Sequence, residues 1–170
     1  MKKSFTLFTL LLCMLLLVGC GKDKETKKDP SNGDSNGSNQ KVLECTNKSK
    51  NTVDNYEINA TYKVYYTTDY VEKIVTVKEI VSNDNNVLDF QKQSFDNSYN
   101  NMKHYYGGYT FTSSKENGKV KYNITIDCLT IKMADLAKDY TRIKPYVDDK
   151  NHISVEGLKV IYESLGASCK

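Results

Sequence analysis

Apolar and polar residues alternate most regularly between positions 56 and 66. The positions of one parity are Tyr56, Ile58, Ala60, Tyr62, Val64 and Tyr66. A period of two is typical of a strand with one buried face. After a turn at 67–69, the β-branched run at 70–81 predicts an antiparallel partner strand, so the two form a hairpin. A short strand is expected before them at 42–46, followed by a polar turn at 48–55.

The pattern then changes to a helical period. Leu88, Phe95, Tyr99, Met102 and Tyr106 are spaced by seven, four, three and four residues, which places them on one face of a helix. Residues 82–86 supply several helix caps, and the glycines at 107–108 are a typical stop signal. The sequence therefore predicts an amphipathic helix that lies on the sheet.

A second hairpin and a closing helix complete the predicted elements. A strand begins at 109–112, Asn117-Gly118 is a strong hairpin turn signal, and the chain returns at 119–128. The inward residues of that return are Tyr122, Ile124, Ile126 and Cys128. Ser154 caps a short helix that ends at Gly166, whereas 129–153 has no clear period. The inward residues of that helix are Leu158, Ile161, Tyr162 and Leu165.

This order of elements predicts an α+β domain. We expect an antiparallel sheet of about five strands, with one amphipathic helix and a short C-terminal helix packed on it. Residues 42–170 have the length of one ordinary domain with a single core.

The first 41 residues follow none of these patterns. Two lysines precede an apolar run at 5–18, which is shorter than the roughly 20 residues that a membrane-spanning helix needs. Such a segment is typical of a secretory signal peptide, here residues 1–19. Leu17-Val18-Gly19-Cys20 resembles the bacterial lipobox. The resemblance implies that Cys20 receives a diacylglycerol group, becomes the mature first residue and carries a further acyl group on its amine.

Acylation explains how the protein would be held without a membrane-spanning helix, because two or more acyl chains anchor a protein stably. Residues 20–41 contain the lipidated cysteine and a polar tether without aliphatic or aromatic residues after it. Such a composition cannot bury apolar surface, so we expect it to remain disordered. The predicted location is the extracytoplasmic face of a cell membrane. The Asn-, Lys- and Tyr-rich usage favours an AT-rich genome and a Gram-positive source.

Charge excludes one class of partner. The full chain has a net charge of +3, and removal of Lys2 and Lys3 with the signal segment leaves 22 basic against 21 acidic residues. Nucleic-acid binding depends on clustered Lys and Arg, and Arg142 is the single arginine. We therefore expect no nucleic-acid partner.

Three cysteines remain in the expected domain: Cys45, Cys128 and Cys169. They allow three pairings and at most one internal disulfide. We favour Cys45 with Cys169, because the termini of a domain tend to lie together. Cys128 has the phase of a buried apolar residue of its strand. The alternative is that all three cysteines stay reduced.

Candidate chemistry is sparse. His104 and His152 cannot be brought together from sequence, and the chain has no nucleophile elbow, phosphate-binding glycine loop or Cys-x-x-Cys motif. The acidic loop at 148–152 lacks the alternating acids and central glycine of a calcium loop. We expect neither catalytic residues, nor a cofactor, nor a metal site.

Tyrosines are the more informative residues. The chain has 13 tyrosines and no tryptophan. Tyr65 and Tyr70 lie out of phase with the expected core, and Tyr105 and Tyr109 flank the glycine pair. Exposed tyrosines are enriched at binding surfaces, so these four are the candidate contacts for a glycan, peptide or protein. The alternative is that tyrosine replaces phenylalanine and tryptophan in a small core.

Four features belong together: the lipobox, Leu43-Glu44-Cys45-Thr46 after the tether, the hairpin–helix–hairpin order and the closing helix before Cys169-Lys170. In this combination the chain resembles the YehR-like family of small bacterial lipoproteins. The resemblance implies an envelope lipoprotein and brings no activity with it. We expect a non-catalytic binding module for an envelope protein or glycan. The alternatives are an accessory subunit of a membrane protein complex and, third, an envelope hydrolase.

Overall fold

The structure is a computed structural model, and it describes residues 40–170. The predicted signal segment, Cys20 and all but the end of the predicted tether lie outside these described residues. The elements are β1 (Lys41–Asn51), β2 (Tyr56–Tyr66), β3 (Val71–Val81), α2 (Asn85–Tyr106), β4 (Tyr109–Glu116), β5 (Lys119–Asp127), α3 (Met133–Asp139), η1 (Lys144–Tyr146), α4 (Val155–Ser164) and β6 (Ser168–Cys169). No helix in the described part combines the length and the apolar character that a membrane span requires.

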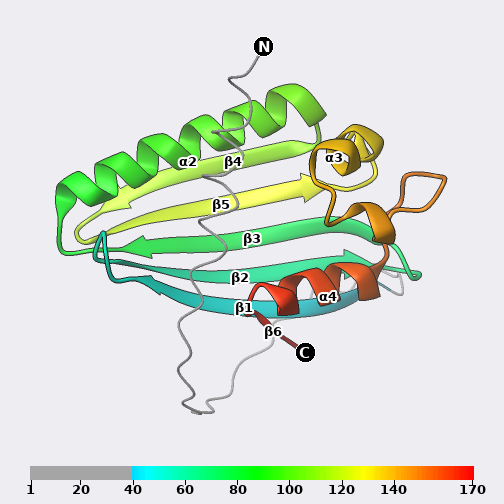
Figure 1. Ribbon diagram of the computed structural model, residues 1–170, viewed down its shortest axis with the longest axis horizontal. Coiled ribbons are helices and arrows are strands. Elements are labelled where there is room, and N and C mark those ends of the chain that lie inside the picture. Colours follow the sequence, from blue (N-terminus) through cyan, green and yellow to red (C-terminus); the bar gives the residue numbers. More distant parts are fainter. Residues whose placement is uncertain (1–39) are drawn as a thin grey trace.

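The strands form one antiparallel sheet in the order β4-β5-β3-β2-β1-β6 (Figure 1). The predicted α+β class and antiparallel sheet are confirmed. The strand count is six, whereas about five were expected. The additional strand is β6, whose two residues pair with Cys45 and Thr46 of β1. A two-residue strand is too short to produce a periodic pattern in the sequence.

The first strand is also longer than the sequence predicted. β1 pairs with β2 without interruption, from Lys41 opposite Tyr66 to Asn51 opposite Tyr56. The predicted turn at 48–55 is therefore confined to 52–55. Backbone groups form the ladder, and a neighbouring strand can satisfy them whatever the side chains are. The Asn51 side chain closes the turn by accepting hydrogen bonds from the backbone N–H groups of Val53 and Asp54.

The two predicted hairpins and the long helix are confirmed. Asp84 caps α2 by accepting a hydrogen bond from the N–H of Asn86, as expected from the capping signals. The helix ends at Tyr106 with Gly107 as its C-cap, and β4 begins at Tyr109. Gly108 has φ +64, and a Cβ there would lie 2.8 Å from the carbonyl oxygen of Asp127. Only glycine fits this close approach of the helix exit to the end of β5.

Both long helices lie on the same face of the sheet. Phe95 of α2 packs against Tyr122 of β5, and Tyr162 of α4 stacks on Tyr62 of β2. Tyr62 and Tyr122 lie on the same face of the sheet. Tyr62 pairs with Thr76 and Tyr122 pairs with Lys78, and Thr76 and Lys78 are two residues apart on β3. Figure 1 shows that α2 runs along β4 and β5 whereas α4 lies over β1 and β2. The core fills the space between the helices and this inner face.

The segment at 129–153, which has no clear period in the sequence, forms α3, the 3₁₀ helix η1 and an isolated bridge between Val147 and Ile153. It explains a glycine inside α4. The ring of Tyr146 lies against Gly157, and a Cβ at position 157 would collide with it. Ser154 caps α4 through the N–H of Gly157, as predicted.

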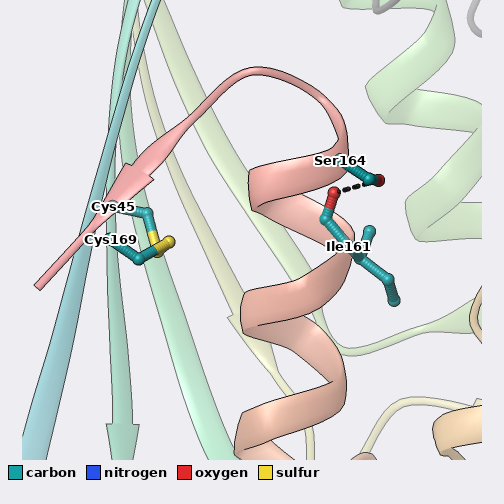
Figure 2. The surroundings of a disulfide bond; sticks show 4 residues. All are labelled: Cys45, Ile161, Ser164 and Cys169. Atoms are coloured by element: carbon teal, nitrogen blue, oxygen red, sulfur yellow. Dashed lines mark hydrogen bonds between the residues drawn. A yellow bond between two sulfur atoms is a disulfide. The ribbon is translucent and has the colours of Figure 1, made fainter.

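The disulfide joins Cys45 and Cys169, which is the pairing favoured from the sequence. Figure 2 shows the two side chains meeting where β6 lies against β1, with α4 beside them. Backbone hydrogen bonds of 3.1 and 2.9 Å between Glu44 and Lys170 continue this pairing. Cys128 is buried and has a free thiol.

Candidate functional site

The four tyrosines proposed as a binding surface do not lie together. Tyr65 is on the outer face of the sheet, where its ring is 4.6 Å from Nζ of Lys73. Tyr70 is 40% exposed and precedes β3, and Tyr105 is 63% exposed near the end of α2. Tyr109 is buried, because it is the first inward residue of β4. The structure therefore corrects the prediction that Tyr109 is exposed, and it places Tyr65 and Tyr109 on opposite faces of the sheet.

The histidines also lie on different elements. His104 is exposed near the end of α2. His152 lies in the loop before α4, with Nδ1 3.5 Å from the Asp148 carboxylate. That carboxylate also accepts hydrogen bonds from the backbone N–H groups of Lys150 and His152, and the latter lowers the pKa of Asp148. Within residues 40–170, no group of three or more His, Cys, Asp or Glu side chains is arranged to hold a metal ion.

The thiol of Cys128 is a poor nucleophile in this environment. Burial, with a smaller effect from Asp127, raises its pKa to about 12. A thiolate is the reactive form of cysteine, so the thiol stays protonated and unreactive near neutral pH. Cys128 therefore behaves as the small buried residue that its phase in the sequence indicated.

The outer face of the sheet is a solvated surface. Its lysines mostly pair with neighbouring carboxylates: Lys63 with Glu44 at 3.8 Å, and Lys119 with Glu79 at 3.4 Å. Antiparallel sheets commonly have one face on the core and one in water. The outer face therefore needs no partner to explain it.

The inner face contains one residue that this pattern does not explain. Lys78 of β3 lies among the inward residues of the sheet, directly between Ala60 of β2 and Tyr122 of β5. Its Nζ donates a hydrogen bond of 2.8 Å to the hydroxyl of Tyr99 on α2. The same ammonium group lies 4.4 Å from the centre of the Phe95 ring and 5.5 Å from that of Tyr99.

Two more tyrosines complete this group. The rings of Tyr62 and Tyr162 stack with centroids 4.4 Å apart, joining β2 to α4. The charge of Lys78 acts on Tyr62, since each shifts the pKa of the other. We call Lys78, Tyr62, Tyr99 and Tyr162 the lysine–tyrosine cluster. It includes residues of both long helices and of the two central strands between them.

The electrostatics of the cluster are unusual in one respect. Burial lowers the pKa of Lys78 and raises the pKa values of Tyr62, Tyr99 and Tyr162. All four side chains nevertheless keep partial exposure to solvent. In the described part of the chain, no carboxylate forms an ion pair with Lys78, whose partners are a phenol and two aromatic rings. The arrangement can hold an anionic group, because it supplies a positive charge without an acidic partner.

The sequence analysis did not select Lys78. The signal was present, because Ile74, Thr76, Lys78 and Ile80 have one parity in a β-branched strand. A lysine in that phase belongs on the buried face. The approach of Tyr99 and Tyr162 depends on how the helices dock, which the sequence pattern does not give.

Comparison with known proteins shows the fold only. No family model and no curated protein matches the chain. The NMR structure of the Escherichia coli YehR protein is similar, with a TM-score of 0.53 at 14% identity over 78% of this chain and 92% of YehR. An NMR structure of a protein from Streptococcus pneumoniae TIGR4 has a TM-score of 0.46 at 8% identity, over 90% of this chain and 98% of that one. This protein and YehR therefore share the arrangement of strands and helices.

Proposed function

We propose that this protein is a lipid-anchored, non-catalytic binding protein on the extracytoplasmic face of a Gram-positive cell membrane. The sequence LVGC at 17–20, after a short apolar run, supports lipid attachment at Cys20. We also propose that the chain is a distant member of the YehR-like family. The shared fold and the sequence features that flank the domain support this membership.

The observation that carries the binding role is that the ammonium group of Lys78 forms no ion pair with any carboxylate of residues 40–170. Partial burial removes part of the hydration of a cation, and an acidic partner commonly compensates for this loss. A bound ligand with a negative charge would supply the acidic partner that residues 40–170 do not. The buried thiol of Cys128 and the placement of the two histidines on different elements favour binding over catalysis.

Photocrosslinking in cells tests this role. A photoreactive phenylalanine analogue replaces Tyr162 in the lysine–tyrosine cluster, and a matched control carries it at Thr112 on the outer face of β4. We expect an envelope component to be captured at position 162 and to be absent at position 112. Equal capture at both positions, or capture at neither, would contradict the proposal. Capture of a membrane protein from position 112 alone would favour an accessory subunit instead.

Detergent partitioning tests the anchor independently. The protein should enter the detergent phase of a Triton X-114 extract, and Cys20→Ala should move it to the aqueous phase or leave its signal segment uncleaved. Cys13→Ala is the matched control, because Cys13 lies in the segment that we expect to be removed. Unchanged partitioning and unchanged mass of the Cys20→Ala protein would refute lipidation at this residue.

A further inference from the structure

We propose that the lysine–tyrosine cluster binds a small organic carboxylate with an apolar body, its carboxylate on Nζ of Lys78 and its body against the aromatic rings. This inference rests on the proposed binding role and specifies the ligand class.

The positive charge of Lys78 indicates the head group of the ligand. Lys78 provides one positive charge with three N–H donors, and one of these already donates to Tyr99 at 2.8 Å. A carboxylate can accept hydrogen bonds from the remaining N–H groups, and such charge-assisted hydrogen bonds are stronger than neutral ones. It can also accept a hydrogen bond from the Tyr99 hydroxyl. A cationic ligand would instead face the like charge of Lys78.

The aromatic rings around Lys78 indicate the apolar body of the ligand. Phe95 is buried under α2, its ring 5.9 Å from that of Tyr99. On the opposite side, Tyr62 and Tyr162 present a stacked pair. These rings are apolar on their faces, and their phenols supply polar edges. Contact with these rings favours an alkyl or aryl chain, whereas a strongly hydrated polar chain would lose its hydrogen bonds to water.

A second lysine on the same strand shows that the arrangement is specific. Lys73 also belongs to β3 and also lies near a tyrosine ring, that of Tyr65 at 4.6 Å. It is on the outer face, however, where it pairs in register with Asp127 of β5. Lys73 is therefore a lysine with a similar contact to a tyrosine ring, but it does not lie beside the helix residues Tyr99 and Tyr162. It is the matched control for Lys78.

Octanoate is the probe, and octanol and octylammonium have the same chain with a neutral and a positive head. Titrations of the full-length protein are followed by two-dimensional NMR. We expect octanoate to shift signals of the cluster, with an affinity at least about tenfold higher than that of octanol, since hydrogen bonds to charged groups are worth about 1.5–3 kcal/mol. Octylammonium should bind more weakly than octanol. Equal affinities for octanoate and octanol would overturn the proposal without any variant.

The variants locate the site. Lys78→Met should weaken octanoate binding at least about tenfold, and Lys73→Met should leave it unchanged. Tyr99→Phe, which removes one hydroxyl, should weaken binding by about three- to fivefold. Unchanged binding in Lys78→Met would overturn the assignment. If Lys78→Met does not fold, Lys78→Arg decides, because it keeps the charge and should retain octanoate binding over octanol.

The outcomes separate this inference from the binding role itself. If octanoate does not bind but photocrosslinking at position 162 captures an envelope component, the ligand class is wrong and the binding role stands. If neither experiment gives a signal, both proposals are wrong.

Discussion

Removal of the disulfide gives the largest stability change that the structure predicts. Cys45 and Cys169 are separated by 124 residues, so their bond closes nearly the whole domain into one loop. In the chain-entropy relation, a loop of this length restricts the unfolded chain by roughly 5 kcal/mol at 25 °C. Native disulfides of small domains typically contribute about 2–5 kcal/mol. We therefore expect the Cys45→Ala/Cys169→Ala variant to lose about 3–5 kcal/mol.

Urea unfolding with and without dithiothreitol measures this loss. With a slope of about 1–3 kcal/mol per molar urea, a loss of about 4 kcal/mol lowers the unfolding midpoint by at least about 1.3 M. Reductant should lower the midpoint of the wild-type protein by a similar amount and leave that of the double variant unchanged. Cys128→Ala is the control, because its midpoint must still respond to reductant.

The result that refutes this reasoning is specific. A double variant that loses less than about 1 kcal/mol would mean that the loop is not constrained in the way the separation implies. A reductant response that persists in the double variant would have another cause. Either outcome would remove the disulfide as the link between the two ends of the domain.

Gly157, the buried phenols and Lys78 each give a further prediction. Gly157→Ala should destabilise the protein by about 1 kcal/mol in urea unfolding, because overpacking against Tyr146 costs about 1–3 kcal/mol and outweighs the better helix propensity of alanine. Glu156→Ala on the exposed side of α4 is the control. A Gly157→Ala protein that is more stable than the wild-type protein would contradict the contact with Tyr146. Burial raises the pKa values of Tyr62, Tyr99, Tyr109 and Tyr162, so the folded chain binds more protons than the unfolded one above pH 10, and the free energy of unfolding should fall there. In an alkaline titration, the tyrosinate absorbance of these four phenols should appear together with unfolding. Burial lowers the pKa of Lys78 from 10.5, so the charged lysine destabilises the fold below that pH. Lys78→Met should therefore be more stable than the wild-type protein at pH 7 in urea unfolding, and the difference should shrink toward pH 10.5. A difference that stays constant with pH would refute the assigned cause.

The sequence predicted those parts of the fold that depend on local periodicity. The alternation at 56–66, the helical spacing from Leu88 to Tyr106 and the Asn117-Gly118 turn each specify one element within a single segment. The polar half of β1 is different, since residues 47–51 form a strand because β2 pairs with them. β6 likewise depends on β1 and on the disulfide. Elements stabilised by a distant partner therefore leave little local signal.

The candidate site was missed for the same physical reason. The phase of Lys78 in β3 places it on the inner face, but the sequence does not say which side chains cover that position. Tyr99 lies 21 residues after Lys78 and Tyr162 lies on a separate helix. The four tyrosines that were selected rested on predicted exposure alone. Exposure is a property of the assembled fold, and for Tyr109 it was wrong.

The disulfide and the lysine–tyrosine cluster belong to one structural unit. Cys45 lies directly opposite Tyr62 in the register of β1 and β2, and Tyr62 stacks on Tyr162 of α4. The chain leaves α4 and within five residues reaches Cys169, which is bonded to Cys45. The disulfide therefore ties the C-terminal end of α4 to β1, and β1 pairs with β2, which contains Tyr62. α2 is held separately, because β3 and β4 continue into its two ends. Lys78 lies between α2 and α4. A ligand bound at Lys78 would contact both helices, and their relative position depends on the disulfide.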